Sequence, residues 1–205
     1  MPDRPYPPLK PPQLVLLRHG ETEWSLNGRH TGVTDLPLTE EGERRARAVR
    51  PVLAGRDFGL VLSSPRRRAI RTAELAGFAG RIEVDPDLAE FDYGAYEGLT
   101  TPQIREQRPD WDLWRDGTPP GDTPGETPEQ VRQRVERVIA RAETVMDEGK
   151  DVLCVAHSHV LRAFAAAWVG LPADGGKRLV LSTAGLGTLG YEHGNRVIDL
   201  WNVTP

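Results

Sequence analysis

The feature that most constrains the fold is a run of four apolar residues, 14–17 (LVLL), that ends in Arg18, His19 and Gly20. Four such residues in succession predict a short strand that is buried on both faces, as in the middle of a parallel sheet. Open α/β sheets bind their ligands beyond the carboxyl ends of their strands. We therefore expect Arg18 and His19 to lie at the ligand-binding edge of such a sheet.

Strand and helix signals alternate along the rest of the chain. They predict, in order, a helix over 39–55, a strand over 58–63, a helix from Ser64 and Pro65, a strand over 81–84, helices from Thr101 and from Thr127 to 149, a strand over 151–156, a helix to about 169, and strands over 178–182 and 186–193. This order is typical of an α/β fold. We predict a three-layer α/β/α sandwich with a mostly parallel central sheet.

The length of 205 residues suits a single folded domain, which we place at residues 13–205. Residues 1–12 are rich in proline and predict a flexible N-terminal arm. We expect a small helical cap to be inserted at about 91–127, a segment that carries Trp111 and Trp114.

Composition narrows the classes of partner. The formal net charge of −4 argues against a general nucleic-acid-binding surface. No stretch reaches the roughly 18 apolar residues of a membrane span, and the first residues lack the apolar region of a secretory signal. The single cysteine, Cys154, fits a reducing compartment. We therefore expect a cytoplasmic protein that binds neither nucleic acid nor membrane.

Side chains that are able to act in catalysis follow several of the predicted strands. His19 and His157 each end a strand, an arginine cluster (66–68 and 71) follows another strand, and Glu90 lies in a later loop. Guanidinium groups near a helix N-terminus bind phosphate, although such a cluster is also typical of a solvated helix face. The convergence of imidazoles, guanidiniums and a carboxylate at one sheet edge indicates a catalytic site rather than an ordinary polar loop.

Other catalytic patterns are absent from the sequence. There is no Gly-x4-Gly-Lys-Ser/Thr loop, no Gly-x-Ser-x-Gly elbow and no His-Glu-x-x-His. Cys154 is followed by Arg162 eight residues later, which does not match a Cys-x5-Arg phosphatase. His157 and His159 offer half of a metal site without a convincing further ligand pattern. We therefore expect neither a metal nor another cofactor.

Several motifs resemble the histidine phosphatase (phosphoglycerate mutase-like) superfamily, and they occur in the order of that family. They are 17–22 (LRHGET), 31–32 (TG), 35–39 (DLPLT), 64–69 (SPRRRA) with 72–73 (TA), 90–98 (EFDYGAYEG) and 156–157 (AH). Residues 90–98, with 114–117 (WRDG) and 184–187 (AGLG), are most similar to the branch of small acid phosphatases and sedoheptulose bisphosphatases.

The resemblance implies a metal-independent phosphomonoesterase that acts on a small phosphorylated metabolite, with a sugar phosphate as the best candidate. His19 would be the nucleophile that becomes phosphohistidine, with its other ring nitrogen held by a backbone carbonyl. Arg18, Arg68 and His157 would surround the phosphoryl group, and a protonated His157 would favour acidic pH. Glu90 would donate a proton to the leaving alkoxide and then activate water.

The candidate substrate-binding residues are less closely tied to the motifs. They are Ser25, Thr31, Gly32, Tyr93 and Ser158. Ser25 stands where the mutases usually carry asparagine, and Ser158 stands where the family usually has glycine. A positive φ at Ser158 would therefore strain the chain. Trp111, Trp114, His159 and Arg162 fit either a substrate contact or a purely structural role.

Two other functions are compatible with the same fold. A phosphoglycerate mutase would carry arginine directly after the acid residue, whereas Phe91 follows Glu90, and residues 101–127 lack a basic insertion. A regulatory phosphate-binding protein without turnover would have lost at least one of the five catalytic candidates, and all five are present. The sequence thus favours water as the final phosphoryl acceptor, with a small phosphorylated substrate as partner, and leaves a homodimer open.

Overall fold

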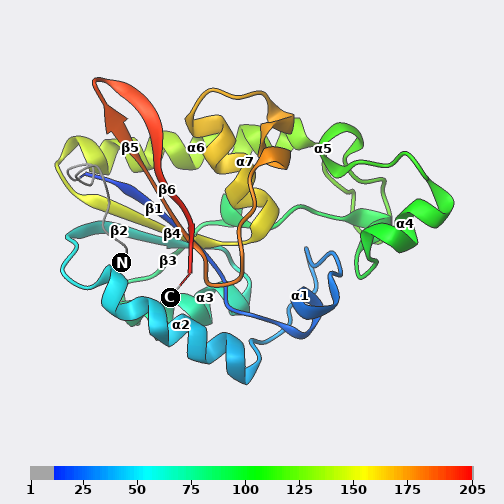
Figure 1. Ribbon diagram of the computed structural model, residues 1–205, viewed down its shortest axis with the longest axis horizontal. Coiled ribbons are helices and arrows are strands. Elements are labelled where there is room, and N and C mark those ends of the chain that lie inside the picture. Colours follow the sequence, from blue (N-terminus) through cyan, green and yellow to red (C-terminus); the bar gives the residue numbers. More distant parts are fainter. Residues whose placement is uncertain (1–11, 205) are drawn as a thin grey trace.

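The structure, a computed structural model, describes residues 12–204, so the predicted arm lies, apart from Pro12, outside the described residues. Within that range one sheet has the strand order β3-β2-β4-β1-β5-β6 (Figure 1). Its strands are β1 (Leu14–Arg18), β2 (Phe58–Ser63), β3 (Glu83–Val84), β4 (Asp151–Ala156), β5 (Leu186–Glu192) and β6 (Asn195–Val203). The first four run parallel to one another, whereas β5 pairs antiparallel with both β1 and β6.

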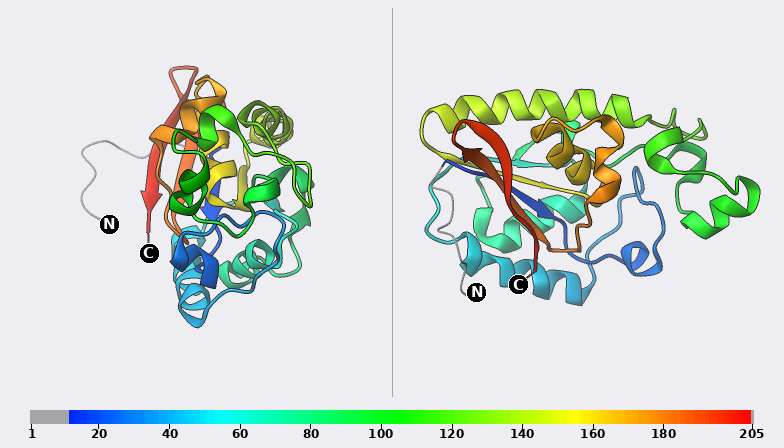
Figure 2. Two further views of the ribbon diagram at one scale, coloured as in Figure 1. Left: turned by 90° about the vertical axis from the view of Figure 1, so that its right-hand side faces the viewer. Right: turned by 45° about the horizontal axis from the view of Figure 1, so that its top comes forward.

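Helices cover both faces of this sheet. The α-helices are α1 (Glu23–Asn27), α2 (Glu40–Leu53), α3 (Arg67–Ala73), α4 (Thr101–Gln107), α5 (Leu113–Asp116), α6 (Pro128–Asp147) and α7 (Ser158–Trp168). Short 3-10 or π-helical turns are η1 (Glu74–Phe78), η2 (Pro86–Leu88), η3 (Gly94–Tyr96) and η4 (Ala173–Arg178). Figures 1 and 2 show α2 and α3 on one face and α6 and α7 on the other, which confirms the predicted three layers.

Alternate residues of the central strands enter two separate cores. Leu14 and Leu16 of β1 pack with α6 and α7, while Val15 and Leu17 pack with α2 and α3. The same alternation runs through β4, which is buried along its whole length. A strand whose two faces are both covered needs apolar residues at every position, which explains the unbroken LVLL run.

The segment over 91–127, which we predict to be a cap, contains α4 and α5, and Figure 1 shows both at one end of the molecule, on the same side as α1. Trp111 and Trp114 are buried within the larger core, and the indole Nε1 of Trp111 donates to the Gly117 carbonyl. Both tryptophans therefore serve the structural role that the sequence left open. Among residues 12–204, no helix combines the length and apolar character needed to cross a membrane.

The predicted strand over 178–182 is wrong, because its backbone bonds to side chains instead of to a neighbouring strand. Arg18 and Ser158 donate to the Leu181 carbonyl, Trp201 donates to the Val180 carbonyl, and the Ser182 N–H donates to Asn202. The last strand is β6, which the sequence analysis did not predict. It follows a two-residue turn in which both His193 and Gly194 have positive φ, typical of a tight hairpin.

The loop after β1 contacts the first turn of α2 backbone to backbone. A Cβ atom built on Gly42 would lie 2.2 Å from the carbonyl oxygen of Glu21, and one on Gly20 would lie 2.4 Å from the carbonyl oxygen of Gly42. The Thr39 N–H, at the N-cap of α2, also donates to the Glu21 carbonyl. Glycine at 42 therefore permits the approach that places His19.

We expect Gly42→Ala to lower the free energy of unfolding by about 1–3 kcal/mol, because it forces a backbone displacement in a packed region. Helix propensity alone predicts the opposite sign, since alanine is favoured over glycine by about 1 kcal/mol. Urea unfolding monitored by circular dichroism measures the change. Arg47→Ala, an exposed position of the same helix, is the control. A stabilised Gly42→Ala protein would contradict the backbone contact.

Candidate active site

A pocket of about 250 Å³ opens at the carboxyl ends of β1 and β4. It is lined by Arg18 and His19 from β1 and the residue after it, by Ser158 and His159 from the start of α7, and by Glu90 from the loop after η2. Three segments that are distant in sequence therefore meet where the strand ends predicted a site. Within residues 12–204, no three His, Cys, Asp or Glu side chains are grouped as metal ligands.

The His19 imidazole is buried and oriented by the backbone. Its Nδ1 lies 2.6 Å from the Gly20 carbonyl oxygen, which accepts the Nδ1 hydrogen and leaves a lone pair on Nε2. Burial, reinforced by the charges of Arg68 and Arg18, lowers the pKa of His19 well below its ordinary value of 6.5. The ring is therefore neutral at neutral pH, as a nucleophile must be.

His157 lies beside His19, with 5.0 Å between ring centroids, and both of its ring nitrogens have partners. The Arg68 Nε–H donates to Nδ1 at 3.2 Å, and the Ser64 hydroxyl lies 2.6 Å from Nε2. Because Nδ1 accepts, Nε2 carries the hydrogen and donates to Ser64. Burial and the charges of Arg68, His19 and Arg18 lower the pKa of His157 well below 6.5, so these surroundings favour its neutral form.

Arg68 is completely buried and does not line the pocket. Its guanidinium donates to the carbonyl oxygens of Thr34 at 2.8 Å and Thr31 at 2.9 Å, besides the bond to His157. It therefore fixes the loop over 31–34 to the site. The sequence analysis assigned Arg68 to the phosphoryl group and did not predict this backbone role.

The Glu90 carboxyl group is held by the first turn of α7. Oε2 accepts from the His159 N–H at 3.0 Å, and Oε1 accepts from the N–H groups of Val160 at 2.9 Å and Phe91 at 3.0 Å. Burial outweighs these bonds and raises the pKa of Glu90 above its ordinary 4.5, so that it holds a proton at higher pH than an exposed carboxyl group. Glu90 therefore occupies two of the N–H groups in the first turn of α7.

Arg18 is the cation that lines the pocket nearest to His19 in sequence. Its Nη1 donates to the Leu181 carbonyl at 2.6 Å, while its buried Nε has no partner among residues 12–204. A buried donor without an acceptor is costly, and such atoms in native proteins call for an explanation. An anion bound between Arg18 and His19 would supply the missing acceptor.

The structure brings together most of the predicted substrate-binding residues. Ser25, Thr31, Tyr93 and Ser158 line the pocket, whereas Gly32 does not. The Gly32 N–H donates to the Glu97 carboxylate instead, and a Cβ there would lie 2.3 Å from the Phe91 carbonyl oxygen. Its glycine is thus explained by close packing. Ser158 begins α7 without a positive φ, so the expected strain is absent.

Several residues of the site carried no predicted role. Thr22 lines the pocket and is the N-cap of α1, where Ser25 completes a capping box. The pattern Ser64-Pro65 suggested a helix N-cap, but α3 begins at Arg67 and the Ser64 hydroxyl contacts His157.

Cys154 lies in the middle of β4, where burial raises the pKa of its thiol and makes it a poor nucleophile, as expected.

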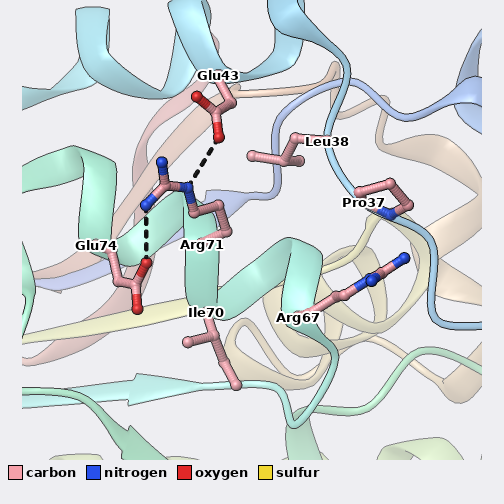
Figure 3. Close-up of a pocket in the computed structure, with 7 residues that line it drawn as sticks. All are labelled: Pro37, Leu38, Glu43, Arg67, Ile70, Arg71 and Glu74. Carbon is pink, nitrogen blue, oxygen red and sulfur yellow. Dashed lines mark hydrogen bonds and ion pairs between the residues drawn. The ribbon is translucent and has the colours of Figure 1, made fainter.

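A larger hollow of about 370 Å³ lies on another part of the surface, between α2 and α3 (Figure 3). Arg71 points into it but pairs with Glu43 at 2.9 Å and with Glu74 at 3.2 Å. Its lining includes none of the predicted site residues. Size alone therefore does not locate the chemistry, and we place the active site in the smaller pocket.

These observations define a class of protein. The chain belongs to the histidine phosphatase superfamily (branch 1), whose family model matches residues 14–204, and it is a hydrolase of the phosphatase type. It is 45% identical to an acid phosphatase of Mycobacterium tuberculosis over 94% of this chain and 93% of that protein. It is 38% identical to sedoheptulose 1,7-bisphosphatase of Saccharomyces cerevisiae, over 78% and 68%. A solved structure of a Mycobacterium tuberculosis open reading frame matches with a TM-score of 0.88 and 45% identity, over 94% and 97%.

The buried imidazoles make stability depend on pH. Burial lowers the pKa of His30 from 6.5 to about 4. Below pH 6.5 His30 is therefore protonated in the unfolded chain, whereas in the folded chain it stays neutral down to about pH 4. Stability therefore falls as pH falls through this window, and the lowered pKa values of His19, His157 and His159 act in the same direction. The raised pKa of Glu90 acts oppositely.

We expect His30→Gln to flatten this acid destabilisation by about 1.4 kcal/mol per pH unit between about pH 6 and 4, which corresponds to one proton. Urea unfolding at a series of pH values measures the slope for each protein. His193→Gln, at the exposed histidine of the β5–β6 turn, should keep the wild-type slope. Equal slopes for His30→Gln and wild type would show that His30 titrates alike in the folded and unfolded chains.

Proposed function

We propose that this protein is a metal-independent phosphomonoesterase that forms a phosphohistidine at His19 and hydrolyses small phosphorylated metabolites, with sugar phosphates as the preferred class. The observation that carries the proposal is the neutral His19 ring, with Nδ1 bound to the Gly20 carbonyl and Nε2 free. The acid phosphatase and sedoheptulose bisphosphatase relatives support the same reaction and substrate class.

In the first step, Nε2 of His19 attacks phosphorus while the leaving alkoxide takes a proton. Glu90 is the proton donor, because its raised pKa keeps a proton available and it lines the same pocket. Arg18 stabilises the charge on the transferring group. Arg68 adds its charge from behind His157 and holds the surrounding loop in place.

In the second step, Glu90 as carboxylate removes a proton from the water that attacks phosphohistidine. Hydrolysis rather than return of the phosphoryl group is supported by Phe91, which follows Glu90 and is completely buried. A mutase needs a cation there to hold a phosphorylated acid. We therefore prefer the phosphatase to the mutase and to a phosphate-binding protein without turnover.

His157 does not itself line the pocket, so a phosphate bound there would act on it through its charge. A dianion near its ring would raise its pKa, against the lowering effect of burial and Arg68. Protonated His157 would then neutralise charge on the phosphoryl oxygens. Turnover should accordingly be favoured by mildly acidic pH. The cytoplasmic location and a homodimer stay predictions.

We expect His19→Ala to lower turnover of p-nitrophenyl phosphate by at least about a thousandfold, because it removes the proposed nucleophile. The wild-type reaction should survive EDTA, and acid-labile phosphate should be trapped on His19 after a rapid alkaline quench and detected by mass spectrometry. His193→Ala is the matched control. Turnover that His19→Ala retains, or that the wild type loses in EDTA, would contradict the proposed metal-independent phosphohistidine mechanism.

We expect Glu90→Gln to slow hydrolysis of an alkyl phosphate by about 10²–10⁴-fold, the usual contribution of a general acid or base. The rate of the first step with p-nitrophenyl phosphate should fall much less, because p-nitrophenolate leaves without taking a proton. A stopped-flow burst of p-nitrophenolate followed by slow turnover would report the second step. An equal fall in the rate of the first step for both substrates would argue against Glu90 as the general acid.

A further inference from the structure

The part of the pocket away from His19 is formed by rings that contact one another. The ring of His30 lies 4.7 Å from that of Tyr93 and 5.9 Å from that of His159. His30 Nε2 lies 3.3 Å from the Thr101 hydroxyl. All four residues line the pocket. This cluster, which we call the distal group, is polar but lacks a carboxylate or a guanidinium.

The hydrogen bond between Tyr93 and His159 fixes which ring nitrogen carries the hydrogen. The Tyr93 hydroxyl oxygen lies 2.6 Å from Nδ1 of His159 and has no other partner among residues 12–204. Burial raises the pKa of Tyr93, so the hydroxyl is protonated, and its only available acceptor is Nδ1. Burial and the charge of Arg162 lower the pKa of His159, so that ring is neutral. A neutral ring that accepts at Nδ1 carries its hydrogen on Nε2.

That Nε2–H group has no acceptor among the described residues, although Tyr93 satisfies the other nitrogen. It is not one of the completely buried unpartnered atoms, and its side chain lines the pocket. The His159 backbone N–H is bound to Glu90, which donates the proton to the leaving alkoxide. The main chain of His159 is therefore anchored to the proposed proton donor, and its ring lines the same pocket as Glu90.

Two arginines, of which Arg29 lines the pocket, are held outside this cluster by one backbone carbonyl and one aromatic ring each. Arg29 donates to the Gly98 carbonyl and lies over the ring of Trp24. Arg162 donates to the Gly176 carbonyl and lies over the ring of Trp114 at 5.0 Å. The distal group therefore offers uncharged donors and acceptors, which suit hydroxyl groups.

Resting on the proposed function, we infer that the Tyr93–His159 pair determines specificity by donating the Nε2 hydrogen of His159 to a hydroxyl of the leaving alcohol, so that the preferred substrates are phosphate esters of polyhydroxylated alcohols. His159 is a specificity-determining residue and Tyr93 a positioning residue that fixes its tautomer. Neither is needed to transfer the phosphoryl group.

The test compares two esters of the same chain length, sorbitol 6-phosphate and hexyl phosphate. The wild type should show at least about a tenfold higher kcat/KM for the sorbitol ester. His159→Phe should lower this ratio at least about fivefold, mainly through a higher KM for the sorbitol ester, in line with the loss of one hydrogen bond. Intrinsic differences between the leaving groups cancel when variants are compared.

Three further variants sharpen the result. His159→Gln carries an amide hydrogen near the position of Nε2 and should keep most of the preference, whereas Tyr93→Phe should lose part of it. His193→Phe is the control for the substitution itself. A wild-type ratio near one, or a ratio unchanged in both His159→Phe and Tyr93→Phe, would overturn the inference. If His159→Phe does not fold, Tyr93→Phe decides.

Hydrolysis of p-nitrophenyl phosphate separates this failure from failure of the proposed function. A wild-type protein that does not hydrolyse it lacks the proposed activity, and the inference falls with it. Hydrolysis of p-nitrophenyl phosphate without preference between the matched esters overturns the hydroxyl donor alone. Preference for the sorbitol ester that disappears in His159→Phe and persists in His193→Phe supports it.

Discussion

The completely buried guanidinium of Arg68 is the interaction on which the site depends. A charge without solvent must be surrounded by acceptors, and here they are backbone carbonyls of the loop over 31–34 and Nδ1 of His157. The Asp35 carboxylate lies 4.0 Å from Nη1 and is half exposed, and the charges of Glu90 and Asp35 offset only part of the cost of burial, which lowers the pKa of Arg68. After burial, its charge is the largest cause of the lowered pKa values of His19 and His157. One buried cation thus joins three segments and helps to keep both imidazoles neutral.

Glu90 provides a second link between folding and chemistry. His157, the N-cap residue of α7, makes no side-chain capping bond, and the Glu90 carboxyl group takes that place by accepting from the His159 and Val160 N–H groups. These bonds favour the carboxylate, while burial favours the acid, and burial has the larger effect. The same geometry that caps the helix therefore holds the proton donor at the pocket.

The sequence predicts those parts of this arrangement that depend on local pattern. Apolar runs identified β1, β2 and β4, and the residues that end them include Arg18, His19 and His157. What could not be predicted depends on bonds between distant side chains and backbone. Leu181 accepts from Arg18 across the site, which removes 178–182 from the sheet, and the Ser64 hydroxyl contacts a histidine 93 residues away instead of capping a helix. Gly32 fits the family pattern but lies outside the pocket. A match to the motif does not by itself show whether a residue is needed for packing or for binding.

The two halves of the pocket use burial differently. Next to His19, burial and the nearby arginine charges both lower the pKa of the imidazole. The proposed nucleophile is therefore neutral and lies among cations that could bind an anion. In the distal group, which contains no arginine, burial lowers the pKa values of His30 and His159 and leaves neutral imidazoles with directional hydrogens. Neutral imidazoles cost stability in acid, whereas the proposed mechanism, with a protonated His157 beside the phosphoryl group, is favoured by acid. Under that proposal the pH of greatest turnover lies below the pH of greatest stability, and an anion bound beside Arg18 would narrow the difference between them.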